Sequence, residues 1–125
     1  MVASKSSARV VIVGAGPVGM VCALALNRSG IAVTVFEQEP APVEDQRAAS
    51  LHPSTLEMLD ELGVTEQILP LGLVSSAYRF HDRVSHSVVA EFDLGLMRDE
   101  FRFPFVLQYE QYKLTASIAD RKSVV

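Results

Sequence analysis

The stretch VVIVGAGPVGMVCALALNRSGIAVTVFE, residues 10–37, decides the fold of this chain. It has the order of a β-strand, a glycine turn, an apolar helix, a second β-strand and an acid. The turn has the spacing G-x-G-x-x-G, which indicates dinucleotide binding when a strand precedes it and a helix follows it. We therefore expect parallel strands over residues 9–13 and 31–36, joined by a helix from Pro17 to about Ser29 and ended by Gly30.

Each glycine of the turn has a separate physical role. Gly14 allows a tight turn out of the strand, Gly16 leaves room for a diphosphate to approach the backbone, and Gly19 allows close packing of helix and strand. Pro17 suits the first helical position, where its missing N–H is not needed. The free N–H groups and the positive end of the helix dipole favour a phosphate there. The predicted diphosphate site comprises Gly14, Ala15, Gly16, Pro17, Val18 and Gly19.

Glu37 closes the second strand at the spacing of about 20 residues at which dinucleotide-binding units carry an acid. A carboxylate at this position can accept both hydroxyls of an adenosine ribose, and it repels a 2′-phosphate. The alternative is a glycine-rich turn in an ordinary βαβ unit, with Glu37 merely solvated. Glu37 therefore favours FAD or NAD over NADP, if a nucleotide binds.

Composition narrows the remaining classes of function. A chain of 125 residues with 49% hydrophobic and 21% charged residues suits one modest folded domain. Its net charge of −4, without a cluster of basic residues, argues against a nucleic-acid partner. The single cysteine, Cys22, excludes an intrachain disulfide and a cysteine zinc cage, and we expect it to be buried in the apolar helix.

A secretion signal is the competing interpretation of the N-terminal region. Lys5 and Arg9 precede an apolar run that extends to Leu26, as in a signal peptide. The turn glycines interrupt that run, however, and it is shorter than the ~20 residues that a membrane span needs. We therefore expect a cytoplasmic protein without a membrane partner.

The rest of the chain is predicted in less detail. Residues 1–8 are polar and should be frayed, whereas the region 77–92 has the pattern of an antiparallel β-hairpin inserted into the nucleotide-binding fold. Ser54 and Glu57 form a capping-box pattern at the start of a helix, and Thr65 is expected to cap a further short turn. Residues 110–122 have the pattern of a helix, and residues 123–125 that of the start of another strand. The fold class is α/β: a Rossmann-like βαβ unit with a hairpin insertion and a truncated sheet.

No residue of this chain makes a convincing catalytic base or metal ligand. The histidines, His52, His81 and His86, are expected on the surface or in turns. No spacing typical of a metal site or of a Ser-His-Asp set occurs. The catalytic residues are therefore left unassigned, and no metal is expected.

Four features in order carry a family resemblance: GAGPVG at residues 14–19, Glu37, the segment 46–48 followed by a helix ending in LGV at 62–64, and Leu107-Gln108 followed by a further helix. With these features the chain resembles the N-terminal part of FAD-dependent aromatic-ring hydroxylases, the single-component flavoprotein monooxygenases typified by p-hydroxybenzoate and 3-(3-hydroxyphenyl)propionate hydroxylases. The resemblance covers nearly the whole chain after Ala8.

The resemblance implies specific cofactor contacts. Residues 14–19 would hold the FAD diphosphate and Glu37 the adenosine ribose. Arg47 would reach the diphosphate and ribityl region, and Gln108 would contact the flavin cofactor. The alternatives are a surface ion pair of Arg47 with a neighbouring acid, and a solvated amide at Gln108. In the family, NAD(P)H reduces the FAD, and the reduced flavin uses O₂ to hydroxylate a small phenolic or aromatic substrate.

The family also has features that this sequence lacks: a later Asp-Gly segment, a Gly-Asp motif near the ribityl chain and a substrate-binding sheet. We therefore expect residues 1–125 to be a fragment, a partial FAD-binding domain that is inactive alone. Two alternatives stay open at this point. One is a different FAD or NAD oxidoreductase that shares only the nucleotide-binding unit, and the other is a truncated remnant that binds little.

Overall fold

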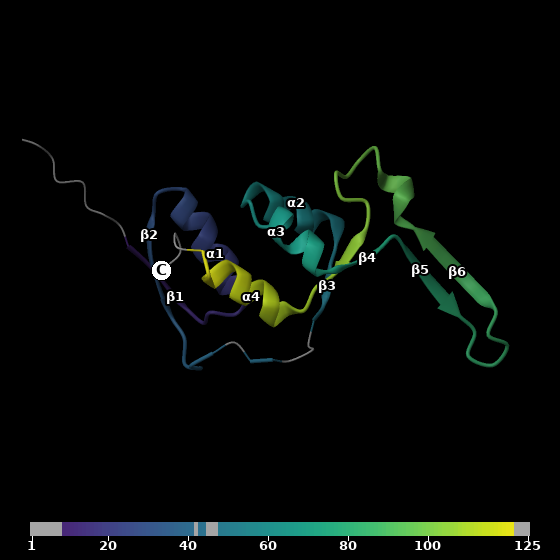
Figure 1. Cartoon of the computed structure of the whole chain (residues 1–125), viewed down its shortest axis with the longest axis horizontal. Coiled ribbons are helices and arrows are strands. Elements are labelled where there is room, and N and C mark those ends of the chain that lie inside the picture. Colours follow the sequence, from purple (N-terminus) through teal and green to yellow (C-terminus); the bar gives the residue numbers. More distant parts are fainter. Residues whose placement is uncertain (1–8, 42, 45–47, 122–125) are drawn as a thin grey trace, which may run out of the picture. The chain divides into compact units, whose positions relative to one another are not determined.

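The computed structural model describes residues 9–41, 43–44 and 48–121. It divides into two compact units, one formed by residues 1–47 and 110–125 and the other by residues 48–109 (Figure 1). The expected frayed start at residues 1–8 and the expected strand at 123–125 lie outside the described residues.

The first unit contains the expected βαβ motif. Strands β1 (Arg9–Val13) and β2 (Ala32–Phe36) pair in parallel, with Val10 opposite Val33 and Ile12 opposite Val35. Helix α1 (Pro17–Arg28) connects them, and Gly30, with φ +75°, follows the helix in the left-handed conformation that glycine favours. The predicted parallel unit is confirmed.

Helix α4 (Gln111–Ala119) belongs to the same unit and packs against α1 (Figure 1). The buried residues of the two helices are Met20, Ala23 and Leu24 on α1, and Leu114, Thr115 and Ile118 on α4. The expected helix over 110–122 is therefore present, but it ends three residues early, with Asp120 as its C-cap.

One face of β1 is exposed, and one burial expectation in this unit is wrong. Val11 and Val13 are 56% and 87% exposed, because β1 turns its other face, with Ile12, toward α1. Cys22 is also exposed rather than buried. It lies four residues after Val18, which is 83% exposed, and both therefore lie on the helix face away from the buried residues.

The second unit is built around short elements. Helices α2 (Pro53–Glu61) and α3 (Thr65–Ile68) and the 3₁₀ turn η1 (Leu69–Leu71) accompany an antiparallel sheet of order β3 (Ser50–Leu51), β7 (Val106–Gln108) and β4 (Leu73–Ser75). The fully buried core residues are Leu56, Leu59, Val64, Ile68, Val106 and Leu107. The local sequence patterns do not predict this sheet.

Two predicted helix caps are wrong. Helix α2 begins at Pro53 with His52 as its N-cap, so Ser54 lies inside the first turn and no side chain caps the helix. Glu57 instead accepts the Arg102 backbone N–H at 2.9 Å. Thr65 is the first residue of α3 rather than its cap, and its buried hydroxyl donates to the Leu56 carbonyl at 2.6 Å.

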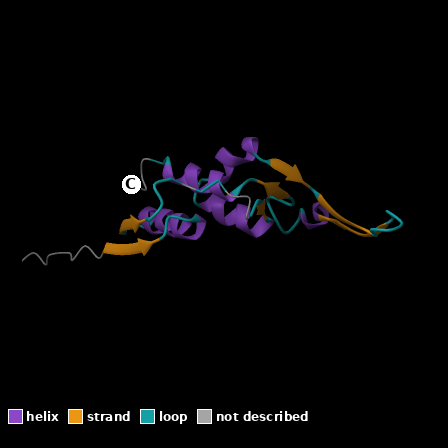
Figure 2. Cartoon of the chain, turned by 90° about the horizontal axis from the view of Figure 1, so that it is seen from below, coloured by secondary structure: helices purple, strands orange, loops and turns teal. Residues whose placement is uncertain are grey.

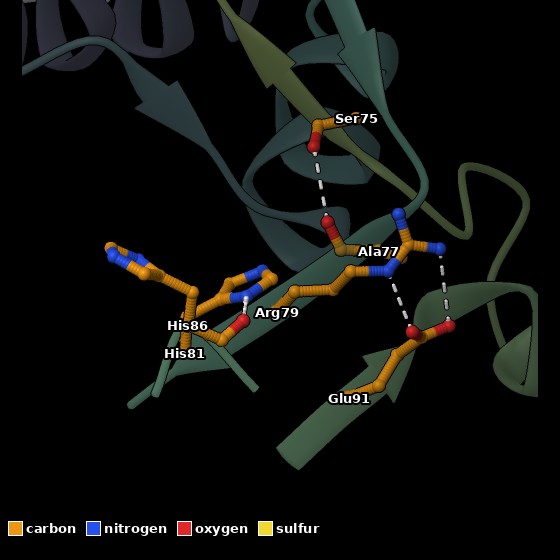
Figure 3. A network of polar contacts seen from close by, with 6 residues as sticks. All are labelled: Ser75, Ala77, Arg79, His81, His86 and Glu91. Carbon is orange, nitrogen blue, oxygen red and sulfur yellow. Dashed lines mark hydrogen bonds and ion pairs between the residues drawn. The ribbon is translucent and has the colours of Figure 1, made fainter. Parts of the chain in front are cut away.

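The predicted hairpin is confirmed. Strands β5 (Ala77–His81) and β6 (Val88–Asp93) pair antiparallel and run side by side as a ribbon, followed by the 3₁₀ turn η2 (Leu94–Met97) (Figures 1 and 2). Arg79 lies directly opposite Glu91 and donates from Nε to Oε2 at 2.6 Å (Figure 3). At the turn, the His81 ring Nδ1 lies 3.3 Å from the His86 carbonyl oxygen.

Candidate dinucleotide site

The glycine turn connects β1 to α1 with a backbone that only glycine adopts easily. Gly14 has φ +103°, in a region that side-chain-bearing residues rarely occupy. Its N–H donates to the Phe36 carbonyl at 2.7 Å, which ties the turn to the end of β2. The tight turn expected at Gly14 is therefore present.

Gly19 lies where α1 crosses closest to the turn. A Cβ at this position would lie 2.0 Å from the Gly14 carbonyl oxygen and 3.3 Å from Ile12 Cγ2. Both distances are shorter than normal van der Waals contact. The close packing of helix and strand therefore requires glycine here, as the motif predicts.

Gly16 is different from the other two glycines. Its φ of −67° and ψ of 178° suit any residue, and a Cβ would meet no atom within 4 Å. Neither backbone conformation nor packing within the described residues requires glycine at this position. The consequence of its missing side chain is open space over the backbone at the start of α1, which fits the approach of a ligand.

The first turn of α1 offers backbone donors beside that space. Gly16 is the N-cap and Pro17 the first helical residue, and no side chain caps the helix. The first intrahelical bond runs from the Met20 N–H to the Gly16 carbonyl at 2.9 Å. The N–H groups of Gly16, Val18 and Gly19 thus have no intrahelical acceptor, and the positive end of the helix dipole adds to their attraction for an anion.

Glu37 follows β2 directly, and its carboxylate lies at the glycine turn. Oε2 accepts the Ala15 N–H at 2.6 Å, and Oε1 accepts the N–H groups of Gln38 at 2.7 Å and Glu39 at 3.0 Å. These amides, with that of Glu39 contributing most and then those of Ala15 and Gln38, hold the pKa of the Glu37 carboxyl below its ordinary value. The acid is therefore ionised at neutral pH.

The turn and the acid line one cavity of about 370 Å³ within the first unit. Its walls come from three segments: the start of α1, the loop after β2, and the side of α4. The lining residues are Ala15, Gly16, Pro17, Met20, Glu37, Glu39, Pro40, Ala41, Val43, Gln111, Tyr112, Thr115 and Ala119. The α4 wall was not predicted, because nothing in the local pattern of residues 111–119 distinguishes a cavity wall from an ordinary amphipathic face.

The structure brings most of the predicted site residues together, but not all of them. Residues 14–19 and Glu37 form the glycine turn and its neighbour. Arg47 lies outside the described residues. Gln108 belongs to the second unit, where its Oε1 accepts the hydroxyl of Ser50, its partner across β3 and β7, at 3.0 Å.

The described part of the chain shows neither a metal site nor a membrane-spanning helix. No group of three His, Cys, Asp or Glu side chains there is placed to hold a metal ion. His52 stacks on Tyr78, with ring centroids 6.4 Å apart, and the other two histidines lie beside the hairpin turn. Among the same residues, no helix is both long and apolar enough to cross a membrane.

Comparison with known proteins identifies the relatives of this chain. Residues 7–123 match the family described as FAD binding domain. The chain is 37% identical over 109 residues to 6-hydroxy-3-succinoylpyridine 3-monooxygenase of Pseudomonas putida, covering 86% of this chain and 27% of that protein. It is 31% identical over 98 residues to para-nitrophenol 4-monooxygenase of a Pseudomonas species, covering 78% and 24% of the two chains.

Solved structures give a consistent result. The crystal structure of p-nitrophenol 4-monooxygenase from Pseudomonas putida superposes with a TM-score of 0.83 at 27% sequence identity, over 89% of this chain and 28% of that one. The chain thus spans about a quarter of the length of the relatives it matches.

Proposed function

Because the chain belongs to the FAD binding domain family and the relatives that it matches are named as monooxygenases, we propose that its glycine turn and Glu37 hold FAD for an aromatic hydroxylase. The observation that carries this proposal is the pairing of an open Gly16 with an ionised carboxylate at the end of the neighbouring parallel strand. The first accommodates a diphosphate and the second a ribose.

The residues fit the two polar parts of the cofactor. The N–H groups at the start of α1 complement a diphosphate, since they point out of a helix end that carries partial positive charge. Glu37 can accept a hydrogen bond from a ribose hydroxyl, and its negative charge disfavours a 2′-phosphate. We also assign Arg47 to the diphosphate and ribityl region and Gln108 to the flavin cofactor, on the family resemblance of their segments.

The activity proposed for the whole protein is hydroxylation of a phenolic or related aromatic substrate, with NAD(P)H as the reductant. Support comes from the relatives, which are named as monooxygenases of nitrophenol and of a hydroxylated succinoylpyridine. Bound FAD supplies the redox and oxygen chemistry, and the protein binds, orients and shields it. The cytoplasmic location expected from the sequence stays a prediction.

The cofactor assignment is tested by titrating the 125-residue chain with FAD, using calorimetry or the change in flavin fluorescence. Glu37→Ala should weaken FAD binding by roughly 1–3 kcal/mol, because a ribose hydroxyl loses its charged acceptor. Glu66→Gln, an exposed change on α3, serves as the control and should bind FAD like the wild type. An unchanged affinity in Glu37→Ala would remove Glu37 from the site.

The activity is tested separately, on the longest reading frame that contains this chain. That protein should purify with FAD and should consume NAD(P)H faster when a phenol such as p-nitrophenol is added. A protein that binds FAD but ignores every phenol would favour the other oxidoreductases that share this nucleotide-binding unit. A chain that binds no FAD at all would favour a non-catalytic remnant.

A further inference from the structure

Two successive N–H groups of the glycine turn are bound by two successive residues at the end of β2. The Gly14 N–H donates to the Phe36 carbonyl at 2.7 Å, and the Ala15 N–H donates to Glu37 Oε2 at 2.6 Å. The first bond continues the parallel β1–β2 ladder past Val13. The second bond uses a side-chain oxygen of Glu37 as the acceptor for the next amide in the chain, that of Ala15.

We propose that Glu37 is a positioning residue as well as a ribose ligand: its carboxylate extends the β1–β2 ladder by one rung and fixes the glycine turn before any cofactor binds. The ribose part rests on the proposed function, whereas the positioning part concerns the chain without its cofactor. A turn that is already fixed avoids the entropy cost of ordering it when the ligand binds.

The acceptor capacity of the carboxylate limits what Glu37 can do for the ribose. An ionised carboxylate has about four acceptor sites. Three backbone N–H groups, those of Ala15, Gln38 and Glu39, already use it. Glu37 can therefore accept one ribose hydroxyl while it holds the turn. The two-hydroxyl contact expected from the sequence would require one of these bonds to open.

The same bonds divide the turn amides into two groups. Those of Gly14 and Ala15 are bound to the end of β2. The N–H groups of Gly16, Val18 and Gly19 have no intrahelical acceptor. The first of these residues, Gly16, is the one at which an added Cβ would meet open space. The diphosphate contacts should therefore start at Gly16, and Ala15 should contribute to the shape of the site rather than donate to the ligand.

Amide hydrogen exchange measured by NMR on the FAD-free chain tests the positioning role. In the wild type, the Ala15 amide should exchange about tenfold or more slowly than that of Gly16, relative to their intrinsic rates. Glu37→Ala should accelerate exchange at Ala15 while leaving Gly14 and Met20, whose acceptors are backbone carbonyls, unchanged. Glu66→Gln should change none of these rates.

Two results would overturn the proposal. One is equal protection of Ala15 and Gly16 in the wild type, a comparison that needs no variant to fold. The other is a Glu37→Ala effect spread equally over Gly14, Ala15 and Met20, which would indicate general destabilisation.

Adding FAD separates this proposal from the proposed function. FAD should slow exchange at Gly16, Val18 and Gly19 and leave the protection of Ala15 as it was. A chain in which Ala15 is protected but FAD has no effect would contradict the cofactor assignment and support the positioning role. Loss of Ala15 protection on FAD binding would contradict the positioning role, because the turn would then rearrange to take up the ligand.

Discussion

Substituting the third glycine of the turn should damage the fold rather than the ligand site. In Gly19→Ala, the new Cβ would lie 2.0 Å from the Gly14 carbonyl oxygen, 3.2 Å from its carbon and 3.3 Å from Ile12 Cγ2. The first two atoms are backbone, and the Gly14 backbone is tied to β2 through its N–H. Helix α1 must therefore move away from the strand to make room.

The expected loss follows from two opposing terms. Overpacking of a well-packed site costs about 1–3 kcal/mol, and a clash with fixed backbone belongs near the upper end. Alanine is favoured over glycine within a helix by about 1 kcal/mol, which offsets part of that cost. The net destabilisation should be about 2 kcal/mol, equivalent to a decrease of about 1 M in the midpoint of urea unfolding for a typical slope.

Gly16→Ala is the matched comparison, since it adds the same methyl group three residues earlier. Its Cβ meets nothing within 4 Å and its φ of −67° suits alanine, so the loss of stability should stay below about 1 kcal/mol, mainly from a poorer N-cap. Its FAD affinity should nevertheless fall at least about tenfold, or 1.4 kcal/mol, because the methyl group projects where the diphosphate approaches.

Both variants are measured by circular dichroism in urea and by FAD titration. The two variants should differ in opposite ways in the two measurements. Gly19→Ala should be the less stable variant, and Gly16→Ala should lose more FAD affinity relative to its loss of stability. A Gly19→Ala chain that unfolds at the wild-type midpoint would refute the packing argument. A Gly16→Ala chain with wild-type FAD affinity would refute the placement of the diphosphate.

Further predictions concern groups with clear partners. Thr65→Val should lower the free energy of unfolding by about 0.5–1.5 kcal/mol, because the Leu56 carbonyl loses a buried donor; an unchanged midpoint of urea unfolding would contradict a stabilising role for this hydrogen bond. The Glu37 carboxyl should titrate below its ordinary pKa of 4.5 in a carbon-detected NMR experiment. Since that pKa is lowered on folding, the stability that the Glu37 carboxylate contributes should be complete above pH 4.5. It should decline as the pH falls through the pKa of the folded state. An NMR titration midpoint at or above pH 4.5 would contradict the hydrogen bonds that this carboxylate accepts. Arg79→Ala should leave the midpoint of thermal unfolding close to that of the wild type, because its ion pair with Glu91 is exposed to solvent; a clear decrease in that midpoint would show that the pair stabilises more than the usual surface ion pair.

Sequence reasoning worked where the signal is local and redundant. The βαβ unit was predictable because strand pattern, glycine spacing, helix and terminal acid each indicate the same structure. The proximity of Glu37 to the turn was predictable because parallel strands that are neighbours end at the same edge. That its carboxylate binds the Ala15 N–H was not predicted, although the same argument brings the two groups together.

Some predictions were wrong or missing because strands pair over long distances in the sequence and because an apolar residue need not be buried. Strands β3 and β4 are two and three residues long, and they exist because β7 pairs with both, which no local pattern reveals. Cys22 and Val18 are apolar yet exposed, because hydrophobicity states only a preference for burial and the partner surface decides. The predicted cap at Ser54 is wrong because Pro53 takes the first helical position, so α2 starts two residues earlier than a cap at Ser54 would place it.

The three glycines of the turn differ in what requires the absence of a side chain, and this difference indicates where a ligand binds. Gly14 is required by its backbone conformation and Gly19 by its packing, so both would be glycine in any βαβ unit with this turn, whether or not it bound a nucleotide. Gly16 is required by neither. Its missing side chain has a physical consequence only for something outside the described chain that approaches the start of α1. The specific argument for a bound diphosphate is therefore strongest at Gly16, and the other two glycines support the fold that presents it.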